Sequence, residues 1–299
     1  NICEEFNFKD YKNNLNENKK KLDSVLNKIS KNKIKYHCLV ALSGGKDSSY
    51  TCYLLKKKYN LNIIAITVEN GFLSQQALKN CKILSKNLGF KHLLVKPGNR
   101  KFINLYKNSI IKRNSENLIK RSSDVCSNCI NLINKIMIKK AVQKNIPIIA
   151  GGYIAGQVPE GSLVLNMNLE FLKSQNKSIL NFQEYIITDN EVKNYNYSYL
   201  SIINPLLSEN YSENKILKEI KKLGWKKSKD TGLHSSNCKI NDLGIKIHLN
   251  KYGFHPYSLE LASQVRTKQI KRNIAIRKLT SKLQKKNLIK TAKKINYQL

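Results

Sequence analysis

The chain has 299 residues, which is enough to bury a substantial core in one or two domains. Its 54 lysines and arginines outnumber its 20 aspartates and glutamates and give a formal net charge of +34. No apolar run approaches the roughly 20 residues that cross a bilayer, and no charged-then-apolar leader opens the chain, so membrane-spanning and secreted classes are disfavoured. We expect a cytoplasmic protein. Because the chain begins at Asn1 and not at methionine, native residues upstream of it are an open question.

Residues 1–30 are polar and rich in lysine, and their apolar positions predict a leader helix. From residue 35 short apolar stretches alternate with amphipathic ones. The predicted strands are 36–42, 62–68, 91–95 and 146–150, and the predicted helices are 47–59, 73–88, 101–122 and 127–144. This order is typical of an α/β fold with a parallel, doubly wound sheet covered on both faces. Pro147 lacks an amide donor and is expected at a strand start or on an edge-like strand.

Residues 157–200 show no dependable pattern, and a helical region follows from Ile202. Its predicted helices are 212–222, 239–251, 257–268 and 270–287. We therefore divide the chain into a leader helix at 1–30, an α/β nucleotide-binding domain at 31–206 and a helical C-terminal region at 207–299.

The large positive charge by itself suggests a nucleic acid or another anionic partner. Only six of the basic residues are arginines, however, the residue type whose planar fork suits bidentate phosphate and base contacts. The many lysines, amid abundant asparagine and isoleucine, are typical of the residue bias of an AT-rich genome. Binding to tRNA therefore stays open and is not favoured.

The most informative stretch is Ser-Gly-Gly-Lys-Asp-Ser-Ser at 43–49, which lies between the first predicted strand and its helix. Glycines allow close backbone approach to a phosphate, and the free amides of a helix start attract it. We expect a triphosphate cradle whose members are Ser43, Gly44, Gly45, Lys46, Asp47, Ser48 and Ser49. In it the serines supply hydroxyl donors, Lys46 a cation, and Asp47 a carboxylate for hydrated Mg²⁺.

The spacing of this stretch differs from the Walker pattern and resembles the SGGxDS motif of the PP-loop ATP pyrophosphatase superfamily. Members of that superfamily cleave ATP between its α and β phosphates. The resemblance implies an adenine nucleotide α-hydrolase-like fold, ATP and Mg²⁺ as cofactors, and Asp47, Lys46 and Ser48 as catalytic residues. In the implied two-step reaction an acceptor oxygen is adenylated with release of pyrophosphate, and ammonia or a sulfur nucleophile then displaces AMP.

Two further segments are expected to meet this loop, because ligands of open α/β sheets lie at the carboxyl ends of the strands. The first contains Val68, Asn70 and Gly71, and the second contains Gly151 and Gly152. The superfamily resemblance implies that the first holds adenine through main-chain groups and that the second closes over the nucleotide. A simple turn at 69–71 is the alternative.

Seven cysteines without a secretory signal argue against a disulfide framework. Cys126 and Cys129 lie at a predicted loop-to-helix junction, where the helix start would favour thiolates. With Cys238, near His234, they are the candidate ligands of zinc or an iron–sulfur cluster, or a dithiol pair. The alternative is that the first two are small helix-capping residues. Cys3 is expected to be an unpaired surface thiol.

Three other side chains receive structural interpretations. His248 and His255 are expected to be packed or solvated and not to act as bases. Trp225 is expected to fill a hydrophobic seam just after a helix.

The order of features is similar to that of the N-acetyl sugar amidotransferases of surface-polysaccharide biosynthesis, one branch of the superfamily. The similar features are the 43–49 motif, residues 65–71, the Cys126/Cys129 pair, the turn at 223–225, Asn237-Cys238 and residues 251–254. The segments 155–161 and 257–260 depart from that pattern. The resemblance implies nitrogen transfer to a sugar or another small acceptor. Because no glutaminase segment is recognisable, free ammonia, a separate glutaminase subunit or a sulfur carrier would supply the incoming atom.

Two alternatives are kept beside the amidotransferase. One is a tRNA thiolation enzyme with a cluster on Cys126, Cys129 and Cys238. The other is a nucleotide-binding regulator without catalysis.

Overall fold

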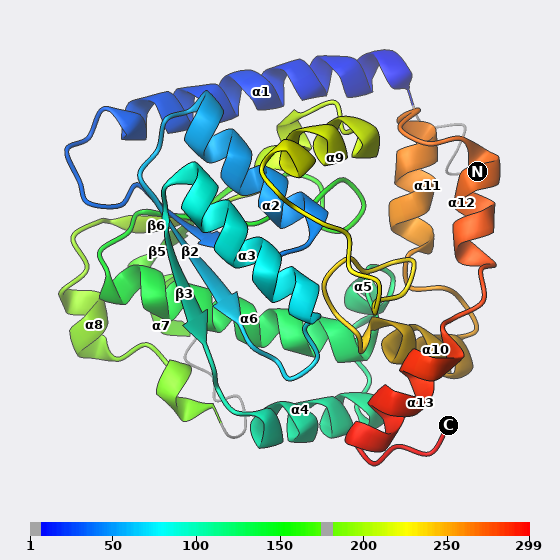
Figure 1. Ribbon diagram of the computed structural model, residues 1–299. Coiled ribbons are helices and arrows are strands. Elements are labelled where there is room, and N and C mark those ends of the chain that lie inside the picture. Colours follow the sequence, from blue (N-terminus) through cyan, green and yellow to red (C-terminus); the bar gives the residue numbers. More distant parts are fainter. Residues whose placement is uncertain (1–6, 175–181) are drawn as a thin grey trace.

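A six-stranded sheet forms the centre of the computed structural model, which describes residues 7–174 and 182–299 (Figure 1). The strand order is β3-β2-β1-β4-β6-β5, and only the edge strand β5 runs antiparallel to its neighbour. The strands are β1 (Cys38–Ala41), β2 (Ile63–Val68), β3 (Lys91–Val95), β4 (Ile148–Ala150), β5 (Val164–Asn168) and β6 (Tyr199–Ile203). The predicted α/β fold with a mostly parallel sheet is confirmed. The expectation for Cys3 falls outside the described residues.

The helices precede, connect and follow these strands. In chain order the α-helices are α1 (Phe8–Ser30), α2 (Lys46–Tyr53), α3 (Gln75–Leu88), α4 (Asn99–Ile111), α5 (Glu116–Ile119), α6 (Asp124–Gln143), α7 (Leu169–Ser174), α8 (Asp189–Lys193), α9 (Glu213–Lys222), α10 (Asn241–Tyr252), α11 (Ser258–Arg266), α12 (Arg272–Leu279) and α13 (Lys285–Lys294). A π-helical segment at Leu54–Lys58 extends α2, and short 3₁₀ turns occupy Gln183–Tyr185 and Pro205–Ser208. In the part of the chain that the structure describes, none of these helices combines the length and apolar character that a bilayer crossing requires.

Two hydrophobic cores lie on opposite faces of the sheet. All six residues of β2 are buried, as a strand covered on both faces requires. In β1, Leu39 belongs to the core shared with α4 and α6, whereas Cys38 and Val40 belong to the core shared with α1, α2 and α3. This alternation follows from the two-residue period of a strand, and it buries Cys38 as a small hydrophobe, as predicted.

The side of the sheet on which the chain adds new strands changes between β1 and β4. From β1 it moves to β2 and β3 on one side, and β4 and β6 lie on the other. The carboxyl ends of β1 and β4 therefore flank the switch point at which ligands bind in open α/β sheets. The 43–49 loop follows β1, and the glycines at 151–152 follow β4, so both lie at this point.

The prediction that residues 157–200 are irregular was wrong for β5, for the short helices α7 and α8 and for the start of β6. β5 is an edge strand with most of its residues partly exposed, and its sequence Val-Leu-Asn-Met-Asn has little of the apolar pattern by which buried strands are identified. Pairing with β6 holds it in place. Pro147 lies directly before β4, as predicted for a strand start, although β4 is central and not edge-like.

Two predicted helices are each divided in the structure. The 101–122 helix consists of α4 and α5, separated at residues 112–115, and the 270–287 helix ends at Leu279, with α13 beginning at Lys285. The division of the chain into domains at residues 31–206 and 207–299 stays a prediction.

Candidate nucleotide site at the switch point

Gly44 makes a turn that a larger residue would strain. Its φ is +75°, in the left-handed region, and a Cβ built on it would lie 2.1 Å from the carbonyl oxygen of Ala77 in α3. Its own carbonyl oxygen accepts hydrogen bonds from Trp225 Nε1 at 3.0 Å and from Asn80 Nδ2 at 3.1 Å. The left-handed conformation of Gly44 and its contacts with α3 and with the segment after α9 therefore fix the conformation of the loop.

The serines of the loop bind one another. Ser43 and Ser48 share a hydrogen bond between their hydroxyls at 3.0 Å, and the amide of Ser43 donates to Ser48 Oγ at 3.2 Å. The amide of Gly45 donates to Ser43 Oγ at 3.3 Å. Ser49 lies deeper: it is fully buried, and its hydroxyl has no hydrogen-bond partner among the described residues. Ser43, Gly45 and Ser48 thus form one compact cradle, with Ser49 behind it.

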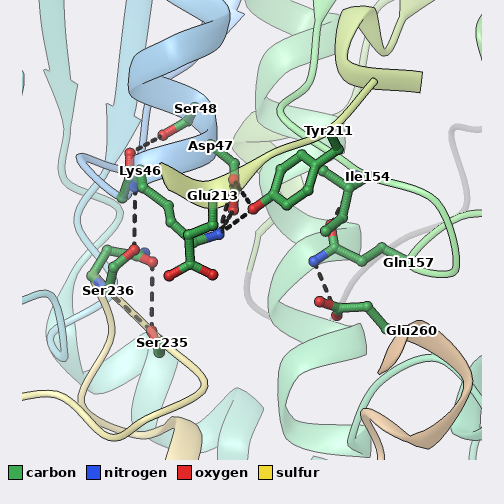
Figure 2. A network of polar contacts seen from close by, with 12 residues as sticks. Lys46, Asp47, Ser48, Ile154, Gln157, Tyr211, Glu213, Ser235, Ser236 and Glu260 are labelled. Atoms are coloured by element: carbon green, nitrogen blue, oxygen red, sulfur yellow. Dashed lines mark hydrogen bonds and ion pairs between the residues drawn. The ribbon is translucent and has the colours of Figure 1, made fainter. Parts of the chain in front are cut away.

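A polar triad of Lys46, Asp47 and Tyr211 stands beside the cradle (Figure 2). Lys46 Nζ lies 2.7 Å from Asp47 Oδ2 and donates to the Tyr211 hydroxyl at 2.7 Å, and that hydroxyl donates to Asp47 Oδ1 at 2.9 Å. Burial by itself would lower the pKa of Lys46, but the attraction of Asp47, Tyr211 and Glu213 raises that pKa above its usual value. Lys46 is therefore a cation held at the loop.

Residues 235–238 cover the loop from the C-terminal region, a contact that the sequence did not predict. The amide of Lys46, at the start of α2, donates to Ser236 Oγ at 3.2 Å. A Cβ on Gly45 would lie 2.9 Å from the same Ser236 oxygen and 3.1 Å from Asn237 Oδ1. A serine oxygen thus accepts from one of the helix-start amides that the phosphate cradle was predicted to use.

The glycines after β4 press against the same helix start. A Cβ on Gly152 would lie 2.8 Å from the amide nitrogen of Ser48, and a Cβ on Gly151 would lie 2.6 Å from Asn204 Oδ1. The structure therefore brings 151–152 against the 43–48 loop, and only a residue without a side chain fits at Gly152.

The segment after β2 reaches the loop indirectly. Val68 is buried in β2, and Gly71, with φ +79°, donates its amide to Glu69 Oε1 at 3.0 Å. Asn70 is buried, and its Oδ1 accepts from the amide of Phe72 at 2.9 Å, so the segment also forms the turn given above as the alternative. The following residues, at 72–74, pair with 237–239, the segment next to the loop.

Two of the three candidate metal ligands, Cys129 and Cys238, contact Asn70, and the third, Cys126, contacts Asn241. Asn70 Nδ2 lies 3.8 Å from Cys129 Sγ and 3.6 Å from Cys238 Sγ, within the range of hydrogen bonds to sulfur. Cys129 also accepts from the Tyr106 hydroxyl at 3.3 Å, and Cys126 accepts from Asn241 Nδ2 at 3.7 Å. Each sulfur therefore faces at least one side-chain donor, the surroundings that thiolates or cluster sulfurs require.

In the structure itself these thiols are neutral. Burial raises the pKa of Cys129 to about 11 and that of Cys238 to about 12, and it also raises the pKa of Cys126. Desolvation outweighs the helix dipole at these thiols, so their surroundings do not favour the thiolate forms that were expected. Among the described residues no group of three or more histidine, cysteine, aspartate or glutamate side chains is arranged to hold a metal ion. The metal assignment of these three cysteines stays a prediction.

The prediction that His248 and His255 are packed is confirmed, and the interpretation of Trp225 was incomplete. His248 and His255 are 1% and 8% exposed. Trp225 is buried beside α9 as predicted, but its indole also donates to the loop through Gly44. The sequence signal was present, since a buried tryptophan seeks an acceptor for its N–H. Only the fold shows that this acceptor is the Gly44 carbonyl.

Replacing Trp225 with phenylalanine is expected to weaken ATP binding by roughly fivefold, because one hydrogen bond to the loop is lost. Tyr195→Phe is the matched control: it also removes one donor to a backbone carbonyl, that of Ile146 at 3.0 Å, at the other end of β4. Calorimetric titration with ATP measures both variants. Equal ATP affinities for the two would contradict a role of Trp225 in shaping the loop.

Comparisons with known proteins agree with the motif. The NAD synthase family model matches residues 17–139, a segment that contains the whole 43–49 loop. The uncharacterized protein MJ1599 of Methanocaldococcus jannaschii is 25% identical over 244 residues, which cover 82% of this chain and 72% of that protein. The family match covers less than half of the chain, and with the motif it makes the chain similar to the NAD synthase-like type of the adenine nucleotide α-hydrolase, or PP-loop, superfamily.

Solved structures give weaker similarities. The NH3-dependent NAD synthetase from Campylobacter jejuni has a TM-score of 0.41 at 14% identity, with coverage of 94% of this chain and 96% of that one. The U34-tRNA thiolase NcsA from Methanococcus maripaludis, with its 4Fe–4S cluster, has 0.41 at 18% identity, covering 90% and 80%. NMN synthetase from Francisella tularensis has 0.43 at 14% identity, covering 99% and 98%. The narrower resemblance to the N-acetyl sugar amidotransferases stays a prediction.

Proposed function

We propose that this protein is an adenylating ligase that activates an oxygen of a small acceptor with ATP, releases pyrophosphate and transfers nitrogen to the activated carbon. The observation that carries the proposal is the cradle at the switch point: a left-handed glycine turn, a helix start and the Lys46–Asp47–Tyr211 triad lie together. Phosphoryl and nucleotidyl transfer depend on this kind of positioning and charge neutralisation.

The residues present fit a nucleotide triphosphate with magnesium. Gly44 and Gly45 leave no side chain between the loop and its neighbours, and Asp47 offers a carboxylate whose side chain remains 21% exposed. When bound, Mg²⁺ would neutralise charge on the leaving pyrophosphate. Lys46 would neutralise further charge once Asp47 turns to the metal, and Tyr211 would hold the Asp47 carboxylate in place.

The reaction balances as follows. The acceptor oxygen forms a bond to the α-phosphorus of ATP while the bond from that phosphorus to the bridging oxygen of the β-phosphate breaks, and pyrophosphate leaves. Ammonia then attacks the activated carbon, AMP leaves with the acceptor oxygen, and the surplus proton passes to solvent. Free ammonia or a separate glutaminase subunit would provide the nitrogen.

An ATP–pyrophosphate exchange assay tests this proposal. Purified protein is incubated with ATP, labelled pyrophosphate and one candidate acceptor at a time, drawn from sugars, small carboxylic acids and tRNA. We expect one acceptor class to stimulate exchange and to yield AMP. Formation of ADP and orthophosphate, or the absence of ATP binding, would refute the proposal.

Sulfur transfer is the second candidate, and the thiols of Cys129 and Cys238, which both contact Asn70, favour it. Cys126, Cys129 and Cys238 would supply three ligands to an iron–sulfur cluster, and side-chain donors already face each sulfur. Protein purified without oxygen would then be brown and contain iron, and Cys238→Ser would lose the colour. Colourless, iron-free protein that still releases pyrophosphate would leave nitrogen transfer as the better account.

A further inference from the structure

Two side chains of the C-terminal region fill the space that the glycines of the 43–49 loop leave beside the start of α2. Gly45 has no side chain, and the place where its Cβ would stand is 2.9 Å from Ser236 Oγ and 3.1 Å from Asn237 Oδ1. A phosphate group that approached Gly45 on this side would meet both oxygens. The close approach for which glycine is suited is therefore blocked by the chain itself.

Ser236 also binds the first amide of α2 (Figure 2). Gly45 is the N-cap of this helix and makes no side-chain capping bond, so the amide of Lys46 needs an acceptor from elsewhere. Ser236, 190 positions further along the chain, supplies that acceptor through its Oγ at 3.2 Å. An oxygen at a helix start is in the position that an oxygen of a bound phosphate takes.

The backbone on both sides of these two side chains is anchored. After them, the amide of Ser74 donates to the Asn237 carbonyl at 2.8 Å, and the amide of Lys239 donates to the Phe72 carbonyl at 2.8 Å. Before them, the amide of Lys226 donates to Asn80 Oδ1 at 3.0 Å. The segment therefore stays beside the loop whether or not its side chains touch it.

The contact itself, by contrast, can open by rotation of one side chain. Within residues 7–174 and 182–299, the bond from the Lys46 amide is the hydrogen bond given for Ser236 Oγ. The Ser236 backbone is held separately, since its carbonyl accepts from Ser228 Oγ at 2.9 Å. Turning the hydroxyl away would thus cost about one hydrogen bond and would leave the backbone pairing intact.

We propose that Ser236 and Asn237 form an autoinhibitory contact, in which the Ser236 hydroxyl occupies the place of an oxygen of the pyrophosphate part of ATP and must leave before that part binds. The proposal rests on the function proposed above, because it concerns regulation of the same site. The apparent affinity for ATP is then lowered by the fraction of molecules in which the contact is closed. AMP lacks the pyrophosphate part and does not compete with Ser236.

Ser236→Ala tests the proposal, because it removes the oxygen from the Lys46 amide and leaves the backbone contacts in place. Thr188→Val is the matched control: it also removes a hydroxyl that accepts from a helix-start amide at 3.2 Å, that of Glu191 in α8. ATP, inorganic pyrophosphate and AMP are each titrated with Mg²⁺ into the wild-type protein and both variants, and binding is measured by calorimetry. Urea unfolding of the three proteins is measured in parallel.

Ser236→Ala is expected to bind ATP and pyrophosphate about fivefold more tightly than the wild-type protein, with its affinity for AMP unchanged. Thr188→Val is expected to keep all three affinities. Both variants lose a capping bond and should unfold at a lower urea concentration. A serine that only capped α2 would give the lower stability without the gain in affinity. The proposal is overturned if Ser236→Ala binds ATP no more tightly than the wild-type protein does, or if its affinity for AMP rises as much as that for ATP.

Asn237→Ala is a second variant, and it carries the test if circular dichroism shows that Ser236→Ala does not fold. It removes the other oxygen that faces Gly45, at 3.1 Å from the Cβ position. We expect it to bind ATP and pyrophosphate about twofold more tightly than the wild-type protein, again without a change for AMP. An unchanged or lower affinity for pyrophosphate would contradict the proposal.

Failure of this proposal is distinguishable from failure of the proposed function. The wild-type protein is also assayed for acceptor-dependent release of pyrophosphate from ATP. If it binds ATP and releases pyrophosphate while neither variant gains affinity, only the autoinhibitory contact is wrong. If the wild-type protein and both variants bind neither ATP nor pyrophosphate, the ligase assignment and the contact are both wrong.

Discussion

Asp47→Ala is expected to reduce acceptor-dependent pyrophosphate release by a factor of roughly 10² to 10³ or more, while the protein stays folded. In the structure this carboxylate is the only acidic group that contacts both Lys46 and Tyr211 within the described residues. Without it, Lys46 keeps its hydrogen bond to the Tyr211 hydroxyl and the weaker attraction of Glu213, and the loop loses its proposed magnesium ligand. Coupled detection of pyrophosphate and chromatography of AMP measure the effect.

The folded state should survive because the Asp47 side chain is partly exposed at the site and is not part of either core. The Lys46 and Asp47 side chains are only 20% and 21% exposed, so losing their ion pair costs more than the about 0 to 1 kcal/mol of an exposed pair, and a lower urea midpoint with retained folding is expected. Asp189→Ala serves as the control, since its side chain is 76% exposed at the start of α8. Full turnover by Asp47→Ala would show that the cradle is assigned to the wrong residues.

Gly44→Ala is expected to be the most damaging single substitution in the loop. Alanine at φ +75° costs about 1 to 2 kcal/mol from the backbone conformation alone. Its Cβ would also lie 2.1 Å from the backbone oxygen of Ala77, which cannot rotate away as a side chain can. Either the loop or α3 must move, and we expect the free energy of unfolding to fall by about 3 kcal/mol or more, with ATP binding lost.

Gly89→Ala separates the two causes of that loss. Gly89 caps α3 with φ +64°, and a Cβ there would meet nothing within 4 Å. This variant should therefore lose only the conformational part, about 1 to 2 kcal/mol, and keep its affinity for ATP. Urea unfolding and ATP titration of both variants provide the comparison. If the two were equally stable and bound ATP equally, the close contact between Gly44 and α3 would have no importance.

Local sequence was sufficient to identify the parallel sheet and the glycine turn of the 43–49 loop. A strand of continuous apolar residues such as β2 and a glycine turn such as 43–45 carry their structure in adjacent residues. The edge strand β5 could not be found in this way, because it is partly exposed and depends on pairing with β6. The partners of the loop, Tyr211, Trp225 and Ser236, could not be found either, since each lies more than 160 positions along the chain from the residue it contacts.

What the sequence by itself determined is therefore the turn and the helix start that carry the motif, and from them it predicts ATP, because the amides and hydroxyls of the motif are adjacent in the chain. What only the tertiary structure decided is the surroundings of that motif. Gln157 and Glu260 lie in the two segments, 155–161 and 257–260, that depart from the amidotransferase pattern, and no local signal joins them. The fold brings them to 3.1 Å from each other. The partial burial of Glu260 and its contact with Gln157 depend on packing between elements that are remote in the sequence. Such packing is a property of the whole chain and cannot be read from neighbouring residues.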